Sequence, residues 1–352
     1  MDTTQSNVIK IAKGMCILLV VWGHTMIPSI RGKSGIIYDI WTVIYLFHMP
    51  VFFAASGILY ELNRERYEQR LVKFIKDKFK LLIIPYISIS VSVYLVLMIL
   101  IQIPGLSKVV AQYVHSVDGL GGALKEIITY ENHIAQHLWF VIVLFLIFVV
   151  NILLSKANQK TVCWLLTIIP LFALPLLKAV SEIPDVPNYF LFEIPFFMVG
   201  RLLVQEKEIL KKVTTVNPSP IIFVVLAGVY IFFIEGTDIL PQPIRWIYLF
   251  STRCMGICMV LSVSAVVEKG RVFNAVFKYL ESKSYPIYLL HQPFIVSGVA
   301  GVLNTVGVPY FLIILPVTVL GILVPLIIDR ILENNNLYRF LILGGRTNKR
   351  RD

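Results

Sequence analysis

Two residues near the start of the chain have types and a spacing that could support acyl transfer. Lys13 and His24 lie eleven residues apart in an apolar segment. On an α-helix, this spacing places both side chains on one face, about 20° and about 16 Å apart. A cation and an imidazole at that separation suit a long donor with an anionic head, such as the extended arm of coenzyme A. The alternative is that Lys13 reaches lipid headgroups and that His24 hydrogen-bonds a neighbouring helix.

Further ionisable residues lie in apolar segments or at their ends, where such groups are costly and often functional. They are Asp39, His48, His137, Glu193, Arg253 and His291. Arg253 needs a carboxylate, phosphate or carbonyl partner, for which Glu193 is a candidate, and a buried structural ion pair is the alternative to a functional role. Ser56-Gly57, in the same segment as His48, permits the close approach of another helix. His48 precedes Pro50, which should kink its helix and free backbone carbonyls. His48 therefore suits a structural hydrogen bond as well as a substrate contact.

Sequence patterns for a metal site or a nucleophilic serine do not accompany these residues. HExxH, GxxxxGK[ST] and GxSxG are absent from the sequence. The four cysteines lie in apolar stretches and predict no disulfide framework. Cys254 and Cys258 have no companion ligands, which favours helix packing. The histidines are too scattered to indicate a zinc site, so we expect no bound metal and no permanently bound cofactor.

The elements that position these residues must be membrane-spanning helices. The chain of 352 residues is 57% hydrophobic and only 15% charged, with a mean hydropathy of +0.78. Too few polar residues remain to coat a soluble globule, which excludes a soluble enzyme, a disordered chain and a disulfide scaffold. The net charge of +11 would suggest nucleic acid in a soluble protein. In a membrane protein it marks loops that face anionic lipid, so we expect no nucleic-acid partner.

Ten segments are long and apolar enough to cross the hydrocarbon core of a membrane. They are 8–28, 36–60, 81–103, 137–155, 161–180, 189–204, 218–235, 244–267, 284–303 and 309–331. We therefore predict an all-α, polytopic membrane helix bundle. The first segment lacks a small-residue cleavage pattern and is interpreted as a retained helix rather than a signal peptide.

The distribution of Lys and Arg predicts the orientation of the bundle. With the N-terminus inside, the cytoplasmic segments hold 25 of the 32 basic residues and the outer segments hold six. Both termini are therefore expected in the cytoplasm, with the chain in the cell membrane. We expect one membrane domain over 1–331 and a basic cytoplasmic tail over 332–352. Within the domain, 61–80 predicts a cytoplasmic interfacial helix, with a charged linker as the alternative, and 104–136 an extracytoplasmic loop.

Several blocks of polar and aromatic residues follow one another in a defined order. They are Ile11-Ala12-Lys13-Gly14-Met15 running into Val20-Val21-Trp22-Gly23-His24, Phe47 to Phe53 with Ser56-Gly57, His137-Leu138-Trp139-Phe140, the weaker Pro195 to Gly200, and Tyr285 to His291. Their order and spacing resemble the acyltransferase-3 family of integral membrane acyltransferases, over nearly the whole chain. The Lys-Gly form of the first block is similar to the fucose 4-O-acetylase-like branch.

The resemblance implies a reaction. An acyl group, usually acetyl, would move from cytosolic acyl-CoA to a hydroxyl of an extracytoplasmic or lipid-linked glycan. The wider family often has arginine at the position of Lys13, and lysine keeps the charge but lacks the bidentate fork that suits phosphate. Many relatives carry an additional extracytoplasmic esterase-like domain. Because only a basic tail follows the tenth predicted span, we expect this chain to act alone or with a separate partner.

Within that reaction, the residues can be given roles. His24 is the candidate general base, because a neutral imidazole can take up the hydroxyl proton, and an acyl-histidine intermediate is the less favoured variant. Lys13 would hold the coenzyme A phosphates, and Arg253 would contact the pantetheine or polarise the carbonyl. The acceptor side would be formed by His48, Glu193, His137 and Trp139, with His291 on either side.

The competing class is a transporter or flippase for a glycan or small solute. It shares the spans and the buried charges. It does not, however, need a basic residue at the cytoplasmic entrance on the same helix face as a histidine. An inactive membrane sensor of the same fold is a third interpretation. For the enzyme, the expected partners are acyl-CoA, a glycan or lipid-linked sugar acceptor and the lipid bilayer. The sequence leaves open the acceptor sugar and the oligomeric state, a homo-oligomer included.

Overall fold

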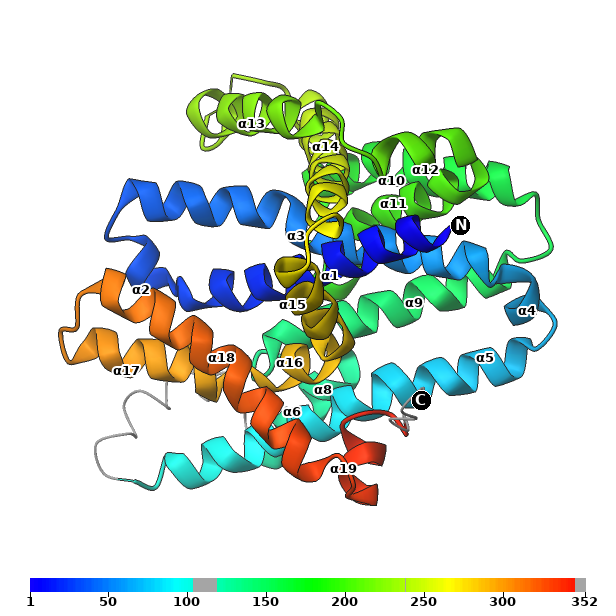
Figure 1. Ribbon diagram of the computed structural model, residues 1–352. Helices are drawn as coiled ribbons and strands as arrows, with labels where there is room; N and C mark the ends of the chain where they lie inside the picture. The colour runs from blue at the N-terminus through cyan, green and yellow to red at the C-terminus, as the bar shows by residue number, and fades with distance from the viewer. Residues whose placement is uncertain (104–118, 238, 346–352) are drawn as a thin grey trace.

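The protein is a bundle of long helices that lie side by side, as a computed structural model shows (Figure 1). The structure describes residues 1–103, 119–237 and 239–345. These ranges contain helices and no β-strand, which confirms the predicted all-α class. One hydrophobic cluster, to which most of the long helices contribute, forms the core.

The helices follow the chain in a simple order. They are α1 (Thr3–Thr25), α2 (Pro28–Arg31), α3 (Gly35–Leu62), α4 (Arg64–Glu68), α5 (Leu71–Lys78), η1 (Phe79–Ile83), α6 (Ile84–Leu100), α8 (Gly119–Thr129), η2 (Gln136–Leu138), α9 (Trp139–Leu153), α10 (Gln159–Val180), α11 (Asp185–Gln205), α12 (Lys207–Val213), α13 (Ser219–Val229), η3 (Tyr230–Ile234), α14 (Gln242–Glu268), α15 (Val272–Ser282), α16 (Ser284–Leu290), η4 (Phe294–Gly298), α17 (Val299–Thr305), α18 (Tyr310–Leu332) and α19 (Asn336–Leu341).

Within the described ranges, seven helical runs are long and apolar enough to cross a membrane. An eighth is added if α16 and the η4–α17 run, which meet at a 54° bend, form one span. Helices occupy all ten predicted segments, but two of them do not meet these criteria. Glu193 and Arg201 lower the hydropathy of α11, and the α13–η3 run is shorter than the rest. The count of ten spans stays a prediction.

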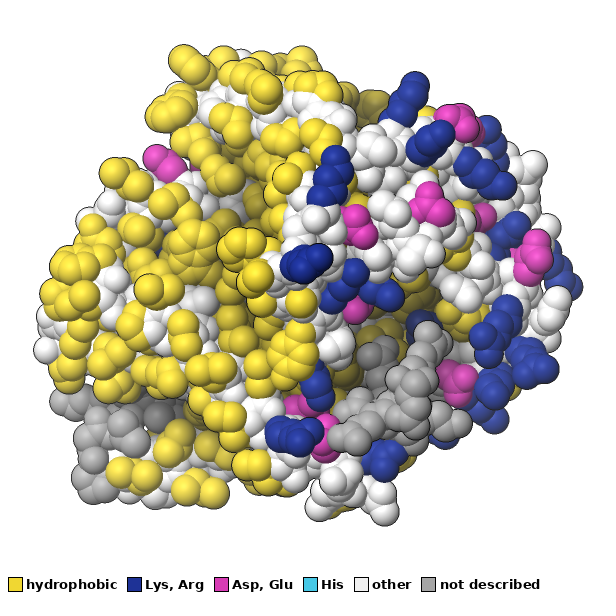
Figure 2. Space-filling view, in the orientation of Figure 1, with side chains coloured by type: hydrophobic (Ala, Val, Ile, Leu, Met, Phe, Trp, Pro, Cys, Tyr) yellow, Lys and Arg dark blue, Asp and Glu magenta, His cyan; other side chains and the backbone are white. Residues whose placement is uncertain are grey.

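Lys and Arg side chains gather over one end of the bundle, around α4, α5 and α12 (Figures 1 and 2). We call this the basic end. The opposite end is formed by α2 and by the connections 181–184 and 306–309, and the surface toward it is mostly hydrophobic in Figure 2. The separation matches the predicted sorting of basic residues. That the basic end and the termini face the cytoplasm stays a prediction.

Helices α3 and α11 approach each other closely because each carries a glycine at their contact. A Cβ atom at Gly57 would lie 2.0 Å from the carbonyl oxygen of Phe197, and one at Gly200 would lie 2.0 Å from that of Ala54. Small residues allow such close helix packing inside a membrane. The close approach predicted from Ser56-Gly57 is therefore confirmed.

The connection predicted as one interfacial helix over 61–80 has a different form. Its first half is divided between the end of α3 and the short α4, and its second half belongs to a continuous run, Leu71–Leu100. Pro85 cannot donate an amide hydrogen bond to the carbonyl of Leu81, and η1 widens the helix just before it. The Leu81 carbonyl accepts the hydroxyl of Tyr285 from α16 instead. Residues 71–80 therefore extend α6 rather than form a helix of their own.

The predicted extracytoplasmic loop 104–136 falls partly on residues 104–118, which lie outside the described ranges. Its second half contains α8 and is attached to α6 by two hydrogen bonds. The Tyr86 hydroxyl donates to the carbonyl of Ile127 at 3.0 Å. The Asn132 amide donates to the Ser90 hydroxyl at 2.6 Å. These bonds hold the segment before α9 over the interior of the bundle.

The predicted tail 332–352 begins with an ordered helix, α19, and its residues 346–352 lie outside the described ranges. The Tyr338 hydroxyl donates to the Asp329 carboxylate at 3.1 Å. Burial, together with this carboxylate, raises the pKa of Tyr338, so its hydroxyl keeps its proton. The Ser88 hydroxyl of α6 donates to the carbonyl of Leu341 at 2.5 Å. The start of the tail is therefore docked on α6 and α18.

Candidate active site

Among the described residues, two of the larger cavities lie toward opposite ends of the bundle. The lysine cavity, of about 190 Å³, lies toward the basic end. Its polar lining residues are Lys13, Ser56, Tyr60, Tyr67, Lys78, Ser284, Tyr285 and Tyr288. The histidine cavity, of about 290 Å³, lies toward the opposite end. Its polar lining residues are His24, Tyr45, Tyr86, Tyr130, Asn132, Gln136, His137, Asp185 and Tyr189, with Trp139 beside them. Among the described residues, the two linings have no member in common.

The lysine cavity has two cations in its wall. The Lys13 ammonium lies 2.5 Å from a carboxylate oxygen of Glu281, and both side chains are about one-fifth exposed, at 21% and 20%. The Lys78 ammonium lies 4.2 Å from the ring centroid of Phe148, a cation–π contact. Burial raises the pKa of the Tyr67 phenol, which therefore stays a neutral donor. This wall can hold an anion, with Glu281 as its competitor for Lys13.

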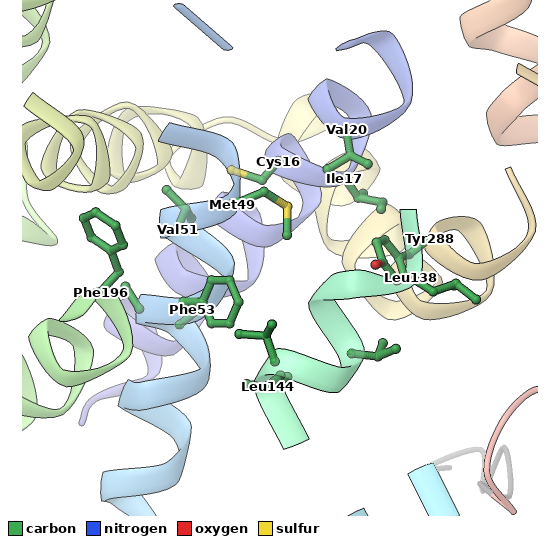
Figure 3. Packing of buried hydrophobic residues seen from close by; sticks show 14 of the residues in the cluster. Cys16, Ile17, Val20, Met49, Val51, Phe53, Leu138, Leu144, Phe196 and Tyr288 are labelled. Carbon is green, nitrogen blue, oxygen red and sulfur yellow. The ribbon is translucent and has the colours of Figure 1, made fainter. Parts of the chain in front are cut away.

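Beyond the two lysines, the lysine cavity becomes apolar. Ile17, Met49 and Leu144 line it from α1, α3 and α9, and Tyr288 lines it from α16. Figure 3 shows these four side chains coming from different helices into the same part of the core. The two lysines suit a ligand with an anionic head, and the apolar lining suits a long, weakly polar arm.

Three histidines from three distant parts of the chain meet in the interior. His24 belongs to the last turn of α1, His137 to η2, and His291 to the bend after α16. The ring centroids of His24 and His291 are 5.2 Å apart, and those of His137 and His291 are 5.6 Å apart. The sequence singled out each of these residues, and the fold brings them together as one histidine cluster.

The imidazole of His291 is held in one orientation. Its Nδ1 lies 2.8 Å from the carbonyl oxygen of Tyr288 and 3.1 Å from that of Ile287. Because carbonyl oxygens only accept, Nδ1 carries the proton in the neutral ring and Nε2 carries the lone pair. The side chain is fully buried, and Nε2 has no hydrogen-bond partner among the described residues. The same holds for Nε2 of His137, which is 7% exposed. Of the two residues, His137 lines the histidine cavity, whereas His291 lies behind it and lines neither cavity.

The histidine cluster lies well inside the bundle. Helix α1 ends at Thr25, directly after His24, but α3 continues toward the opposite end. His24 packs against Tyr45 with ring centroids 6.4 Å apart. Tyr45 is ten residues from Gly35, where α3 begins, which corresponds to about 15 Å of helix. His24 therefore lies about three turns of α3 in from the start of that helix.

The histidine cavity combines aromatic faces with polar groups. The rings of Trp139 and Tyr189 stack at a centroid distance of 4.6 Å. Hydroxyl and amide groups of neighbouring residues, and the Asp185 carboxylate, face the same space. A sugar has an apolar face that suits an aromatic platform and hydroxyls that suit such partners. Trp139 was predicted on the acceptor side, and the structure places it in this cavity.

The structure places Arg253 and Glu193 away from both cavities. An Arg253 guanidinium nitrogen lies 3.7 Å from a Glu193 carboxylate oxygen. The guanidinium also lies 4.1 Å from the ring centroid of Phe192. This buried ion pair between α11 and α14 is the alternative that the sequence left open. The predicted contacts of Arg253 with the donor and of Glu193 with the acceptor stay predictions.

His48 also lies outside the lining of the two cavities. Its Nδ1 lies 2.7 Å from the carbonyl oxygen of Ile44, one turn earlier in α3. Its ring contacts that of Tyr45 at a centroid distance of 4.7 Å. The hydrogen bond to the backbone matches the structural alternative stated for this residue. Through Tyr45, His48 supports the wall that His24 packs against.

Sequence reasoning missed four residues that shape the site. Lys78 was counted only as a cytoplasmic charge, and Glu281 and Asp185 were not considered. Tyr288 was quoted with His291 but received no role, although a spacing of three residues puts the two on neighbouring parts of one helix face. That spacing was the one local signal for Tyr288. The positions of the other three depend on tertiary packing.

The donor set for a metal ion is incomplete. Within the described ranges, no group of three or more His, Cys, Asp or Glu residues is arranged to hold a metal. An imidazole can also take up or pass on a proton, and this is chemistry that the rings of the histidine cluster offer.

Comparison with known protein families gives one match. The family model of the acyltransferase domain, acyltransferase-3, matches residues 7–330 of the chain. No curated protein and no solved structure gives a match. The matched range includes the histidine cluster and the lining of both cavities.

Proposed function

The chain belongs to the acyltransferase-3 family, and from this premise we propose that it moves an acetyl group from acyl-CoA to a hydroxyl of a cell-surface or lipid-linked glycan. Family membership and the apolar helices make it a membrane acyltransferase. The donor, the acceptor and the base are our proposal. One observation supports it most, namely that the histidine cluster lies between two cavities of different chemistry.

We assign acyl-CoA to the lysine cavity. Lys13 and Lys78 would bind the phosphates of coenzyme A, and the apolar part of the cavity would take the pantetheine arm and the acyl group. Glu281 holds Lys13 in the absence of donor, so donor binding requires the ammonium to exchange this carboxylate for a phosphate. The ion pair of Arg253 is left out of this assignment.

We assign the glycan acceptor to the histidine cavity. Its stacked Trp139 and Tyr189 would support the apolar face of a sugar ring, and His24 would lie beside the reacting hydroxyl. The Lys-Gly form of the first sequence block keeps the fucose 4-O-acetylase-like branch as the proposed subgroup. With the basic end in the cytoplasm of a cell membrane, the acceptor would be extracytoplasmic.

In the proposed reaction, a neutral imidazole of His24 takes the proton of the sugar hydroxyl as the oxygen attacks the thioester carbon. The C–O bond forms, the C–S bond breaks, and the proton passes to the leaving thiolate. Nε2 of His137, which lines the same cavity, would hydrogen-bond the sugar hydroxyl and help to position it. No protein group is left changed at the end of the cycle.

The donor assignment can be tested on the detergent-purified chain by thermal unfolding. Acetyl-CoA should raise the Tm, and acetyl-pantetheine, which lacks the nucleotide and its phosphates, should raise it less. Lys13→Ala should remove most of the difference between the two compounds. Stabilisation by glycans or ions, with no effect of either thioester, would instead favour the transporter.

A further inference from the structure

A wall of aromatic side chains separates the lysine cavity from the histidine cavity. Tyr288 and Phe140 line the lysine cavity, with ring centroids 5.6 Å apart. His137 lines the histidine cavity and lies behind them, 6.1 Å from Tyr288 by ring centroids. His291 completes the wall at 6.2 Å from Tyr288. Tyr288 is thus the ring that contacts every other member of this wall.

One hydrogen bond ties the wall together. The Tyr288 hydroxyl donates to the backbone carbonyl of His137, which joins α16 to η2 at the start of α9. Tyr288 is only 8% exposed, and its neighbour Leu138 is fully buried. Figure 3 shows Tyr288 and Leu138 side by side where α9 begins. In such surroundings, few alternative partners exist for either polar group.

We propose that Tyr288 is a specificity-determining residue, which decides between a sugar hydroxyl and water as the acyl acceptor. This inference rests on the proposed function. The histidine cavity is rich in polar groups and is larger than one water molecule needs. Water there would compete with the acceptor for the thioester. The wall held by Tyr288 keeps that water on the acceptor side until a bound sugar takes its place.

The competing reaction is hydrolysis of the donor. A water oxygen forms a bond to the thioester carbon, the C–S bond breaks, and a water proton is taken up by a histidine and passed to the thiolate. The products are acetic acid and free coenzyme A, so no further reactant is needed. The rate of thiol release without any sugar therefore measures how well the wall excludes water.

Tyr248 provides a matched control for Tyr288. Like Tyr288, it donates its hydroxyl to a backbone carbonyl of another helix, here that of Leu226 in α13 at 2.7 Å. Tyr248 lines neither the lysine cavity nor the histidine cavity. Tyr248→Phe therefore removes the same atom without changing the donor site or the wall.

The experiment measures coenzyme A thiol release from acetyl-CoA by the purified full chain, with no sugar present. Tyr288→Phe should hydrolyse the donor about tenfold faster than wild type, the order of change that one lost hydrogen bond supports. Tyr248→Phe should keep the wild-type hydrolysis rate per bound donor. Adding His24→Gln to Tyr288→Phe should return the rate to the wild-type value or below.

Donor binding, followed by the Tm shift with acetyl-CoA, separates the outcomes. Wild type that is not stabilised by acetyl-CoA would overturn the proposed function. A Tyr288→Phe chain that binds acetyl-CoA like wild type but hydrolyses it no faster would overturn the role of Tyr288 and leave the proposed function intact. If Tyr288→Phe does not fold, Phe140→Leu opens the same wall with the hydrogen bond in place. It must then show the same faster hydrolysis, or the inference is wrong.

Discussion

Two buried polar clusters in this bundle differ in how completely their groups are paired. At the basic end, the guanidinium of Arg201 has no exposed surface and binds three partners. It lies 2.7 Å from Glu61, donates to Asn151 at 2.5 Å and donates to Gln159 at 2.9 Å. In the histidine cluster, by contrast, Nε2 of two buried rings has no partner among the described residues.

The difference distinguishes a cluster that stabilises the fold from a cluster whose groups can still bind a ligand. Arg201 joins α11 to α3, α9 and α10, and its hydrogen bonds leave little capacity for a ligand. Buried polar atoms in folded proteins are usually paired, so the two unpaired nitrogens leave the histidine cluster a hydrogen-bonding capacity that Arg201 lacks. The paired cluster should govern stability, and the open cluster should govern activity.

The largest effect is expected at His24. Replacing His24 with Gln should lower acetyl transfer by about 100-fold or more, because the base for the hydroxyl proton is lost. His48→Gln should cost far less, since His48 is bonded to its own helix and lines neither cavity. Turnover by the purified variants at equal abundance checks this. Comparable losses in both variants would contradict the special role of His24.

The next largest effect is expected at the paired cluster. Arg201→Met leaves the carboxylate of Glu61 buried without its main partner, which should destabilise the fold by about 3–5 kcal/mol. Arg330→Met is the control, because that side chain is 75% exposed and pairs with Glu333 at the surface. Its cost should be at most about 1 kcal/mol. Thermal unfolding in detergent measures both, and equal shifts in Tm would remove the distinction between the clusters.

A smaller effect is expected from the ion pair at the lysine cavity. Lys13→Ala should raise the KM for acetyl-CoA about tenfold with little change in kcat, because a charge-assisted contact to phosphate is lost. Glu281→Gln should act in the opposite direction and lower this KM, since Lys13 would no longer be neutralised by its 2.5 Å partner. A fall in kcat at unchanged KM in Lys13→Ala would argue against the phosphate role.

The smallest effect concerns the chain end that docks beside the lysine cavity. Gly344 and Gly345 both have positive φ, at 60° and 77°, so alanine costs about 1–2 kcal/mol at either position. A Cβ atom at Gly344 would also lie 2.5 Å from backbone atoms of Leu81 and Lys80, whereas the site at Gly345 is open among the described residues. Gly344→Ala should therefore lower the Tm more than Gly345→Ala does. Equal shifts would show that the docked chain end is not fixed by this contact.

Much of the fold could be predicted because its signals are local. Apolar runs located the helices, Ser56-Gly57 indicated the close approach of α3, and charge neutralisation pointed to the Glu193–Arg253 pair. For the short α13–η3 run and the charged α11, length and hydropathy alone are not sufficient to identify a membrane span.

The division of the site into two cavities could not be predicted. Lys13 and His24 face the interior from one helix, as their spacing indicated, yet they line different cavities. The wall between them comes from Tyr288 and Phe140 on other helices. No local pattern in the sequence of α1 predicts this wall. The 54° bend after α16, which carries His291 into the cluster, likewise depends on packing.

The most direct test uses sealed proteoliposomes with labelled acetyl-CoA on one side of the membrane. The acceptor, on the other side, is surface polysaccharide from the cells that carry this gene, freed of its esters by mild base. Neither compound crosses the bilayer. With the donor at the basic end, wild type should place labelled acetyl on the polysaccharide and His24→Gln should not. Labelled polysaccharide that appears only when donor and acceptor share one side would contradict an acyl transfer between two cavities.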